Sequence, residues 1–288
     1  MTDDPLLAAS LPDAGAAAPS AARIGARMMA LPALVVLAIL LLPYLGLVLA
    51  TPWGRMAPAD GDWAAVRVSV TYTLLALAID ALLGTPLAWW MARRGGQGQG
   101  GHGRGGLDRP IGGLLDLAVL VPLLTPPLAM GLLLATAFGP YSVIGEGARR
   151  IGVELSNTPA AFLLAQVYAS APYYIFAARA AFAGVPREYE ELSLTLGRGR
   201  WHTFWHVSLP LARLGIATGL ALAWVRALGE FGIALIIAYY PQGIPVRLWV
   251  DLQDAGLSSV YPLLWVFFVI GLPVPLLLGL VSRARHGG

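Results

Sequence analysis

Two ionisable residues stand four positions apart inside a long apolar run, where charges are rare. Arg226 and Glu230 lie in the stretch 214–238, which is otherwise almost entirely apolar. A central Arg or Asp costs about +2.5 to +3.5 kcal/mol to insert into a bilayer, so such a charge is a functional candidate by default. The spacing allows one side chain to partly neutralise the other. The structural alternative is that the two residues only satisfy each other or a neighbouring helix.

A second pair, His202 and His206, has the spacing that can place two imidazoles on one zinc ion. A zinc metalloprotease needs a glutamate directly after the first histidine, and Thr203 stands there instead. We therefore expect interfacial histidines and no metal site. The intramembrane residues Asp80, Asp116 and Arg179 are weaker candidates, and a structural role is favoured for Arg179 because its long side chain can reach the interface.

Two residue types that carry much enzyme chemistry are missing. The chain has no cysteine, which excludes disulfides, thiol nucleophiles and Cys-ligated metals. All 19 basic residues are arginine, which excludes the lysine of a phosphate-binding Walker A loop and any Schiff-base mechanism. If ATP is used, another chain must bind it.

The composition is that of a polytopic membrane protein. Of the 288 residues, 57% are hydrophobic and 12% are charged, where a soluble domain has about 25% charged residues. Stretches of about 20 apolar residues cross a bilayer as helices, because no water is present to pair the backbone. The predicted fold is therefore all-α, with six transmembrane helices at about 29–50, 68–92, 114–138, 158–183, 214–238 and 260–281.

The arginines set the expected orientation. Most of those outside the spans fall before the first span, after the last, and in the second and fourth connections, so both termini are expected in the cytoplasm. A cleaved signal peptide is disfavoured for the first span because its apolar core exceeds the usual 7–15 residues. Residues 1–28 are predicted to be a disordered tail, 29–282 the membrane domain and 283–288 a C-terminal tail. The Gly-rich segment 95–106 is expected to be a flexible cytoplasmic connector.

The fourth connection, 185–210, predicts a short amphipathic helix at the membrane surface. Pro186 suits its first position, and the acidic residues that follow suit the positive end of a helix. Tyr189, Leu192 and Leu196 form an apolar stripe, and Gly197 is a natural left-handed terminator. Such a helix offers its apolar face to a groove in a partner. The alternative is a surface helix without a partner.

The same loop resembles a family signature. Glu191-Leu192-Ser193, Gly197 and Val207-x-Leu209-Pro210 match the spacing of the EAA motif of ABC-importer permeases, E-A-A-x3-G-x9-I-x-L-P. The resemblance implies a type I importer permease fold, in which this helix is the coupling helix that docks into the ATPase. The residues it assigns to ATPase coupling are Glu190, Glu191, Leu192, Ser193, Leu196, Gly197, Val207, Leu209 and Pro210.

The fifth span resembles the equivalent helix of oxyanion importers. Its string from Arg226 to Pro241, with Ile-Ile-Ala-Tyr-Tyr-Pro at the outer end, is most similar to molybdate/tungstate permeases, and so is the Pro-rich 121–127. Sulfate or thiosulfate permeases share most of these features and stay an alternative. The resemblance implies that the pathway or gate contains Arg226, Glu230, Phe231 and Gly232. Because carboxylates repel a dianion, we expect Glu230 to be engaged by Arg226 or by backbone donors.

The resemblance also implies the assembly around this chain. It implies a homodimer in the inner membrane, two cytoplasmic ATPase subunits that hold ATP and Mg²⁺, and an extracytoplasmic substrate-binding protein. The chain itself would bind no cofactor and catalyse no reaction. Three outer loops, about 51–66, 139–157 and 239–257, would receive the binding protein. The alternatives from other classes are an ion-coupled secondary transporter, for which no convincing internal repeat is present, and an intramembrane hydrolase, for which no paired catalytic residues are present.

Overall fold

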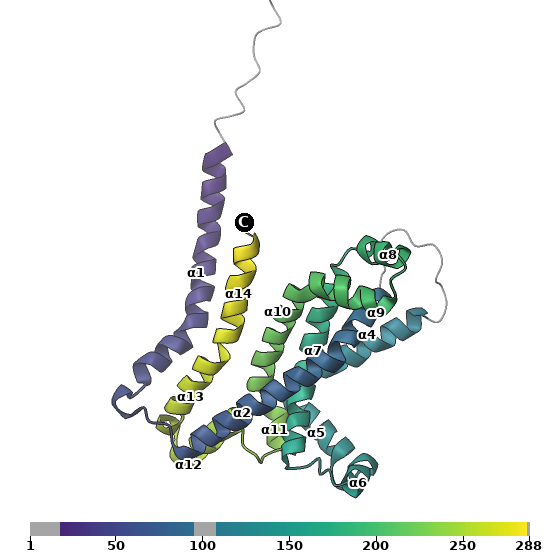
Figure 1. Ribbon diagram of the computed structural model, residues 1–288. Helices are drawn as coiled ribbons and strands as arrows, with labels where there is room; N and C mark the ends of the chain where they lie inside the picture. The colour runs from purple at the N-terminus through teal and green to yellow at the C-terminus, as the bar shows by residue number, and fades with distance from the viewer. Residues whose placement is uncertain (1–17, 95–107, 287–288) are drawn as a thin grey trace, which may run out of the picture. The chain divides into compact units, whose positions relative to one another are not determined.

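The computed structural model describes residues 18–94 and 108–286, and within these ranges the chain forms helices and no strands (Figure 1). The Gly-rich connector predicted at 95–106 lies outside the described residues. Five helices are long and apolar enough to cross a membrane, and the number is six if the sharply bent pair Gly112–Leu124 and Pro127–Phe138 is counted as one span. The predicted all-α membrane fold is therefore confirmed, although several boundaries differ. The chain divides into two units, residues 1–55 and 56–288.

The first unit consists mainly of α1, Ala18–Ala50, whose segment Pro32–Ala50 is apolar enough to span a membrane. The helix corrects the prediction that the whole of 1–28 is disordered, because residues 18–28 belong to it; residues 1–17 lie outside the described chain. The Ala- and Arg-rich sequence of 20–27 has high helix propensity and extends the membrane helix toward the N-terminus. A single 3₁₀ turn, η1 (Trp53–Arg55), follows.

The second span is one continuous helix from Asp60 to Arg94, made of α2 (Asp60–Ile79), one π-helical turn η2 (Asp80–Gly84) and α3 (Thr85–Arg94). It begins before the predicted residue 68. Asp62 explains this early start, because its carboxylate accepts a hydrogen bond from the Ala59 amide at 2.8 Å and a negative charge is favourable in the first turn.

The third span is broken where one helix was predicted over 114–138. Helix α4 (Asp108–Leu124) and helix α5 (Pro127–Phe138) are bent by 115° relative to each other. Two successive prolines remove two backbone donors, and Thr125 before them is driven out of the helical conformation. Thr125 closes the end of α4, because its amide and its hydroxyl both donate to the Val121 carbonyl, at 3.0 and 2.7 Å.

The remaining helices complete the second unit. After α5 they are α6 (Val143–Arg150), α7 (Pro159–Ala183), α8 (Arg187–Thr195), α9 (Arg200–Thr203), the π-turn η3 (Phe204–Ser208), α10 (Leu209–Leu228), α11 (Gly232–Ile237), α12 (Ile244–Ala255), α13 (Leu257–Gly271) and α14 (Pro273–His286). The fourth span agrees with the prediction. The fifth, predicted over 214–238, runs over Arg200–Leu228 instead, and α11 is separate. Residues 283–286 form the end of α14 and lie beyond the last candidate span, which ends at Leu280.

Helices α7 and α10 pack closely along the centre of the second unit (Figure 1). Two glycines of α10 make this possible: a Cβ on Gly215 would lie 2.4 Å from the Cβ of Ala181, and one on Gly219 would lie 3.1 Å from that of Ala177. Close backbone approach at small residues is a main source of helix association in lipid. Buried residues of α3, α7 and α10 then enclose Phe182 and Phe204 in one apolar cluster.

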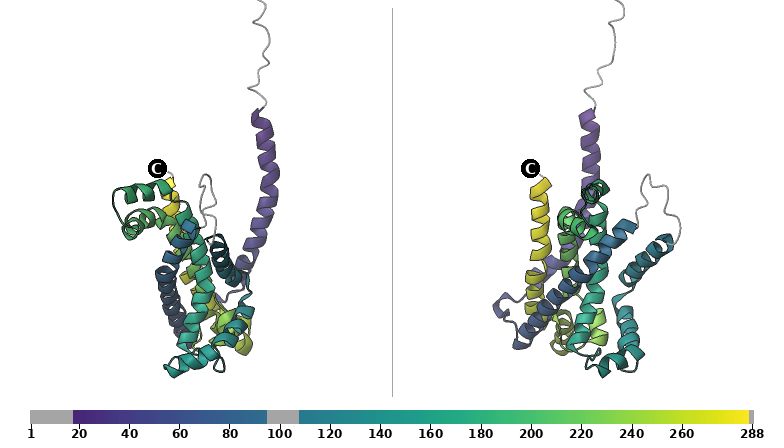
Figure 2. Two further views of the ribbon diagram at one scale, coloured as in Figure 1. Left: turned by 90° about the vertical axis from the view of Figure 1, so that its right-hand side faces the viewer. Right: turned by 45° about the vertical axis from the view of Figure 1, so that its right-hand side comes forward.

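The second unit has two distinct ends. In all three views α8 and the C-terminal end of α14 lie at one end, and α6, α11 and α12 lie at the other (Figures 1 and 2). The predicted outer loops are therefore partly helical, because 60–66, 143–150 and 244–255 belong to α2, α6 and α12.

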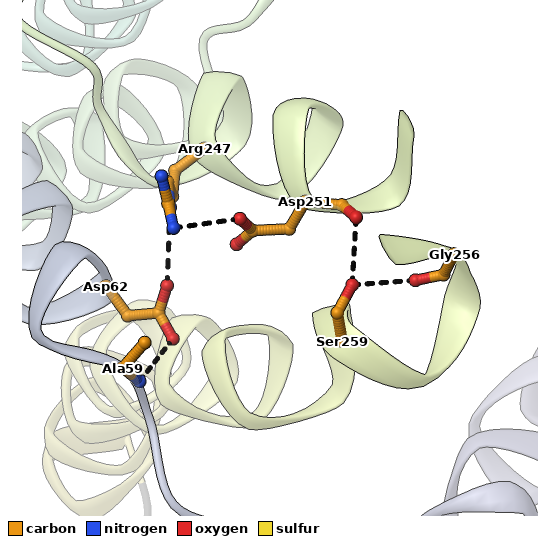
Figure 3. Close-up of polar contacts among 6 residues, drawn as sticks. All are labelled: Ala59, Asp62, Arg247, Asp251, Gly256 and Ser259. Atoms are coloured by element: carbon orange, nitrogen blue, oxygen red, sulfur yellow. Dashed lines mark hydrogen bonds and ion pairs between the residues drawn. The ribbon is translucent and has the colours of Figure 1, made fainter. Parts of the chain in front are cut away.

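At the end away from α8, an arginine joins two helices (Figure 3). Arg247 of α12 pairs with Asp62 of α2 at 3.5 Å and with Asp251 on its own helix at 3.0 Å. Ser259 of α13 donates to the carbonyl oxygens of Asp251 and Gly256 at 2.9 and 2.7 Å. Burial raises the pKa of Asp251 above its ordinary value of 3.8; Arg247 opposes this rise and Asp62 adds to it.

Replacing Gly215 with leucine tests the close packing of α7 and α10. The larger side chain must displace Ala181, and overpacking of this kind costs about 1–3 kcal/mol. We expect a lower melting temperature in detergent than for the wild type. Gly113→Leu is the matched control, because no atom lies within 4 Å of a Cβ at that helical position. Equal melting temperatures for the two variants would contradict the packing argument.

Replacing Asp251 with asparagine tests the charge balance around Arg247. Because the folded-state pKa of Asp251 is raised, the wild type loses stability as pH rises from about 3.8 through that folded-state value. Asparagine does not titrate but can still accept from Arg247. The melting temperature of the variant minus that of the wild type should therefore rise across this window, by about 1–2 °C, and then stay level. A difference that falls with rising pH would show that the sign is wrong.

Candidate functional site

Helix α8 stands at one end of the second unit as the short amphipathic element that the sequence predicts. It covers Arg187–Thr195 and is preceded by Pro186, which takes the N-cap place and not the first helical position. Gly197 has φ +77°, the left-handed conformation expected of the terminator. The amides of Gly197 and Arg198 donate to the carbonyl oxygens of Leu194 and Ser193 at 3.0 and 3.2 Å, which closes the helix end.

One face of α8 is fastened to the membrane helices by polar contacts. Glu190 accepts from Nε and Nη2 of Arg93, at the end of α3, at 3.0 and 2.5 Å. It also accepts from the Ser208 hydroxyl at the start of α10. Both charged side chains are largely buried, with exposed fractions of 12% for Glu190 and 16% for Arg93. This carboxylate therefore joins α8 to two membrane spans.

A second contact fastens α8 to the segment that follows it. Buried Ser193 and Thr203 share a hydrogen bond of 2.9 Å between their hydroxyl groups, and Thr203 also donates to the Gly199 carbonyl. Below them, Phe204 packs on Trp89 and Phe182. The small Ser193 at the second alanine position of the motif thus lies at the interface between α8 and η3, where a large side chain would not fit.

The opposite face of α8 is apolar and exposed. The exposed fractions are 54% for Tyr189, 59% for Leu192 and 72% for Leu196. Leu194, Trp201 and Trp205 are exposed beside them, and Glu191 is exposed as well. A cluster of large apolar side chains at the end of a membrane domain marks an interaction surface. We call Tyr189, Leu192 and Leu196 the apolar face of α8.

The other residues of the motif lie between these two faces. Leu209 is half-buried against the cluster that contains Phe204 and Ala212, and Val207 is half-buried in η3. Pro210 is exposed near the start of α10, directly after the π-turn η3 with which that helix is continuous. These three residues shape the connection between α8 and the fifth span.

The two histidines of this segment stack on each other. The rings of His202 and His206 stack at 4.0 Å between centroids, and Nδ1 of His206 lies 3.1 Å from the His202 carbonyl oxygen. Among the residues whose side chains are described, no three His, Asp or Glu side chains gather in the manner of metal ligands.

The intramembrane charges Arg226 and Glu230 form an ion pair. Nη1 of Arg226 lies 2.5 Å from Oε2 of Glu230, whose side chain is fully buried. The other carboxylate oxygen accepts from the Ile233 amide at 2.6 Å, which supplies a partner to the first turn of α11. Glu230 is thus engaged as expected by both the arginine and the backbone. Glu230 makes these contacts from the segment that follows α10, because that helix ends at Leu228.

The pair lies where two spans are interrupted side by side. Gly229 to Phe231 separate α10 from α11, and α11 packs on α5, which follows the break at Pro126 and Pro127. A Cβ on Gly232 would lie 2.7 Å from the Cβ of Pro127, so only glycine permits this approach. The ring of Phe231 lies 5.8 Å from that of Trp249. Both breaks border a cavity of about 180 Å³, lined in part by Arg226, Tyr168 and Tyr173.

The weaker candidates are also paired. Arg179 of α7 forms a two-pronged ion pair with Asp116 of α4, with one bond at 3.3 Å and one shorter. Asp80, in the π-turn, accepts from the Ser170 hydroxyl of α7 at 2.5 Å. Each pair joins two helices of the second unit, which agrees with the structural role favoured for Arg179.

Sequence reasoning did not identify several residues that the structure brings to these sites. Arg93 and Ser208 hold Glu190, and Tyr168 and Tyr173 line the cavity beside Arg226. One sequence feature could have pointed to Arg93: it is an arginine at the end of a span, and the later helix α8 begins with acidic residues that it could pair with. The pairing itself crosses 97 positions of sequence, and no local pattern specifies it.

The comparisons with known proteins agree with this geometry. The family model for the binding-protein-dependent transport system inner membrane component matches residues 102–286. A probable molybdenum ABC transporter permease of Haloferax volcanii is 32% identical over 206 residues, which are 72% of this chain and 70% of that protein. The molybdenum transport system permease of Escherichia coli K12 is 30% identical over 241 residues, 81% of this chain and 100% of that one.

A more distant relative and a solved structure extend the comparison. The molybdate/tungstate permease of Thermococcus kodakarensis is 28% identical over 210 residues, 73% of this chain and 74% of that protein. A chain of a bacterial alginate ABC transporter, solved with its periplasmic protein, has the same fold, with a TM-score of 0.69 at 16% identity over 90% of this chain and 94% of that chain. The chain therefore belongs to the binding-protein-dependent inner membrane components, the non-enzymatic permease subunits of ABC importers.

Proposed function

We propose that this permease imports a tetrahedral oxyanion, molybdate or tungstate, in an ATP-driven complex. The substrate class rests on the relatives from Haloferax, Escherichia and Thermococcus, which are named for molybdenum, molybdate or tungstate transport. Sulfate or thiosulfate is the alternative, because the motifs of the fifth span are similar in those permeases. Membership in the ABC permease family excludes the ion-coupled secondary transporter.

The observation that carries the mechanism is the two-sided construction of α8. Its apolar face is exposed, while Glu190 and Ser193 fasten the other face to the ends of α3 and α10. A partner that binds the exposed face can therefore move the membrane helices without first unfolding the connection. We assign the outward-facing Glu191, Leu192 and Leu196 to ATPase binding. The remaining motif residues hold and shape the helix: Glu190, Ser193, Gly197, Val207, Leu209 and Pro210.

The complete importer would contain two copies of this chain, two ATPase subunits and an extracytoplasmic binding protein. ATP and Mg²⁺ would bind to the ATPases, which is consistent with the absence of lysine from the entire sequence. The C-terminal end of α14 lies at the same end of the second unit as α8 (Figures 1 and 2). If this chain lies in the inner membrane with α8 facing the cytoplasm, its C-terminus also faces the cytoplasm. The opposite end, with α6 and α12, would receive the binding protein.

The exposed part of Arg226 supports a pathway along α10. The side chain is 24% exposed although it lies within a span. A guanidinium that faces lipid in the middle of a bilayer is costly, so this surface is expected to meet water or a second copy of the chain. We therefore place the pathway and gate at Arg226, Glu230, Phe231 and Gly232.

Reconstitution of the permease with its ATPase and binding protein in proteoliposomes tests the function. We expect ATP-dependent uptake of molybdate and tungstate that requires the binding protein. Uptake of sulfate in preference to both ions would select the alternative substrate. Uptake by the permease alone would contradict the entire proposal.

Replacing Leu192 with aspartate tests the apolar face of α8. An isolated charge in a desolvated interface removes a contact worth about 1–2 kcal/mol, so ATPase binding should weaken about tenfold. The measurement is the amount of ATPase that stays bound to purified, membrane-inserted permease as the ATPase concentration is lowered. Ile151→Asp, at an apolar position at the opposite end that is also exposed, should retain ATPase at the wild-type level. Equal retention by the Leu192 variant would remove α8 as the binding element.

Replacing Glu190 with glutamine tests the fastening of α8 separately from its docking. The ATPase should still bind, because the apolar face is intact. Ions imported per ATP hydrolysed should fall at least about fivefold, because Arg93 loses its charged partner and α8 moves with less effect on α3.

Two further variants make this test specific. Glu188→Gln, at an exposed position on the same helix, should transport normally. In the double variant Arg93→Gln with Glu190→Gln no buried charge is left unpaired, so its loss should be smaller than the sum of the two single losses. Additive losses would show that the ion pair does not carry the coupling.

A further inference from the structure

We propose that the cavity beside the two helix breaks is a transit site in which the permease itself binds the oxyanion during passage. The inference rests on the proposed function, since it assigns to this chain an ion-binding step between the binding protein and the cytoplasm. The site combines Arg226 with the phenols of Tyr168 and Tyr173, on α10 and α7.

The cavity has the size that a hydrated tetrahedral ion needs. Its volume is about 180 Å³. A single water requires about 10–15 Å³ of such space, so an oxyanion and part of its hydration shell can be accommodated. One side of the lining comes from the segments around the breaks: Leu123 and Thr125 lie before the prolines, Met130 lies on α5, and Ile233 lies on α11. The other side comes from α7 and from Arg226 of α10, so the cavity lies between the interrupted spans and an unbroken helix.

The charge of the lining favours an anion. Arg226 is the one charged residue among those that line the cavity in the described part of the chain. Its partner Glu230 is fully buried and held by the Ile233 amide, so the carboxylate is kept out of the cavity and fixes the guanidinium in place. A guanidinium has five N–H donors in a planar fork, which match the oxygens of a tetrahedral anion.

Most of these donors are available. Within the described residues, Arg226 makes one hydrogen bond, from Nη1 to Glu230. The guanidinium carbon lies 5.8 Å from the centroid of the Tyr173 ring, so the phenol and the guanidinium border the same space. The hydroxyl groups of Tyr168 and Tyr173 have no hydrogen-bond partner in the described part of the chain, and each can donate one bond to an anion.

The ion pair also keeps the site weak. A free arginine in a low-dielectric cavity would retain a dianion, whereas an arginine already paired with Glu230 has most of its field compensated. A pathway needs binding strong enough to admit the ion and weak enough to release it. The buried carboxylate thus serves to orient the arginine and to limit its affinity.

The test uses the intact permease–ATPase complex without the binding protein, and tungstate as the probe. Crystals soaked in tungstate should show anomalous scattering from tungsten inside the cavity, and chloride at equal concentration should not displace it. Tyr173→Phe and Tyr168→Phe, which keep the ring and remove only the hydroxyl, should lose this density. Tyr72→Phe, whose ring packs on Phe162 away from the cavity, should keep it.

Uptake by the complete importer in proteoliposomes provides the second measurement. We expect Tyr173→Phe to lower the maximal tungstate uptake rate about three- to tenfold, the loss of one hydrogen bond to a charged group, with unchanged binding-protein affinity. The double variant Arg226→Gln with Glu230→Gln removes the guanidinium without leaving a buried charge unpaired, and should lose more. Its melting temperature separates a folding defect from loss of the site.

Two results would overturn the inference, and they differ. If the wild type imports tungstate and the cavity stays empty at high tungstate, with normal uptake by Tyr173→Phe, the transit site is wrong and the proposed function stands. If the wild-type importer transports no oxyanion at all with ATP and binding protein present, the proposed function fails and this inference fails with it.

Discussion

The need to compensate every polar group inside the bilayer organises the second unit. An unpaired charge or backbone group in lipid costs several kcal/mol, and several ionisable side chains within the spans are accordingly paired, although Oδ1 of Asp80 is buried without a partner among the described residues. Arg179 with Asp116, Asp80 with Ser170 and Arg226 with Glu230 each occupy a defined contact. Two of the pairs join α7 to another helix, and the third spans the interruption after α10. At the interruption after α10, the Glu230 carboxylate accepts from the Ile233 amide and so replaces a bond that a continuous helix would make.

The same principle explains how α8 is both connected and exposed. Glu190 is held by Arg93 and Ser208, so its charge is satisfied where the loop meets the membrane helices. The apolar face, by contrast, is exposed in the described chain. The helix thus presents two faces from one run of sequence, one fastened to the membrane helices and one left open, and the proposed coupling role depends on the open one.

The sequence predicted much of this arrangement because its patterns are local. Apolar length gave the spans, and helical spacing with Gly197 gave α8, since these follow from residues that are neighbours along the chain. It failed where competing local effects had to be weighed. The apolar run 114–138 predicted one helix for the third span, but Pro126 and Pro127 remove two donors in succession and break it. The fifth span was placed too late because the apolar run continues through α11, although the backbone turns at Gly229.

By itself the amino-acid sequence determined the membrane class, the number of spans, the motif of α8 and the charge pair of α10. Each of these features depends on composition or on the spacing of a few residues, because the interactions involved act between neighbours along one helix. Only the tertiary structure decided that Glu190 faces Arg93, that Gly232 lies against Pro127, and that a cavity forms at Arg226. These contacts join residues far apart in the chain. Many helix surfaces are compatible with one another, and only the packing of the whole unit, not a local sequence pattern, decides which of them meet.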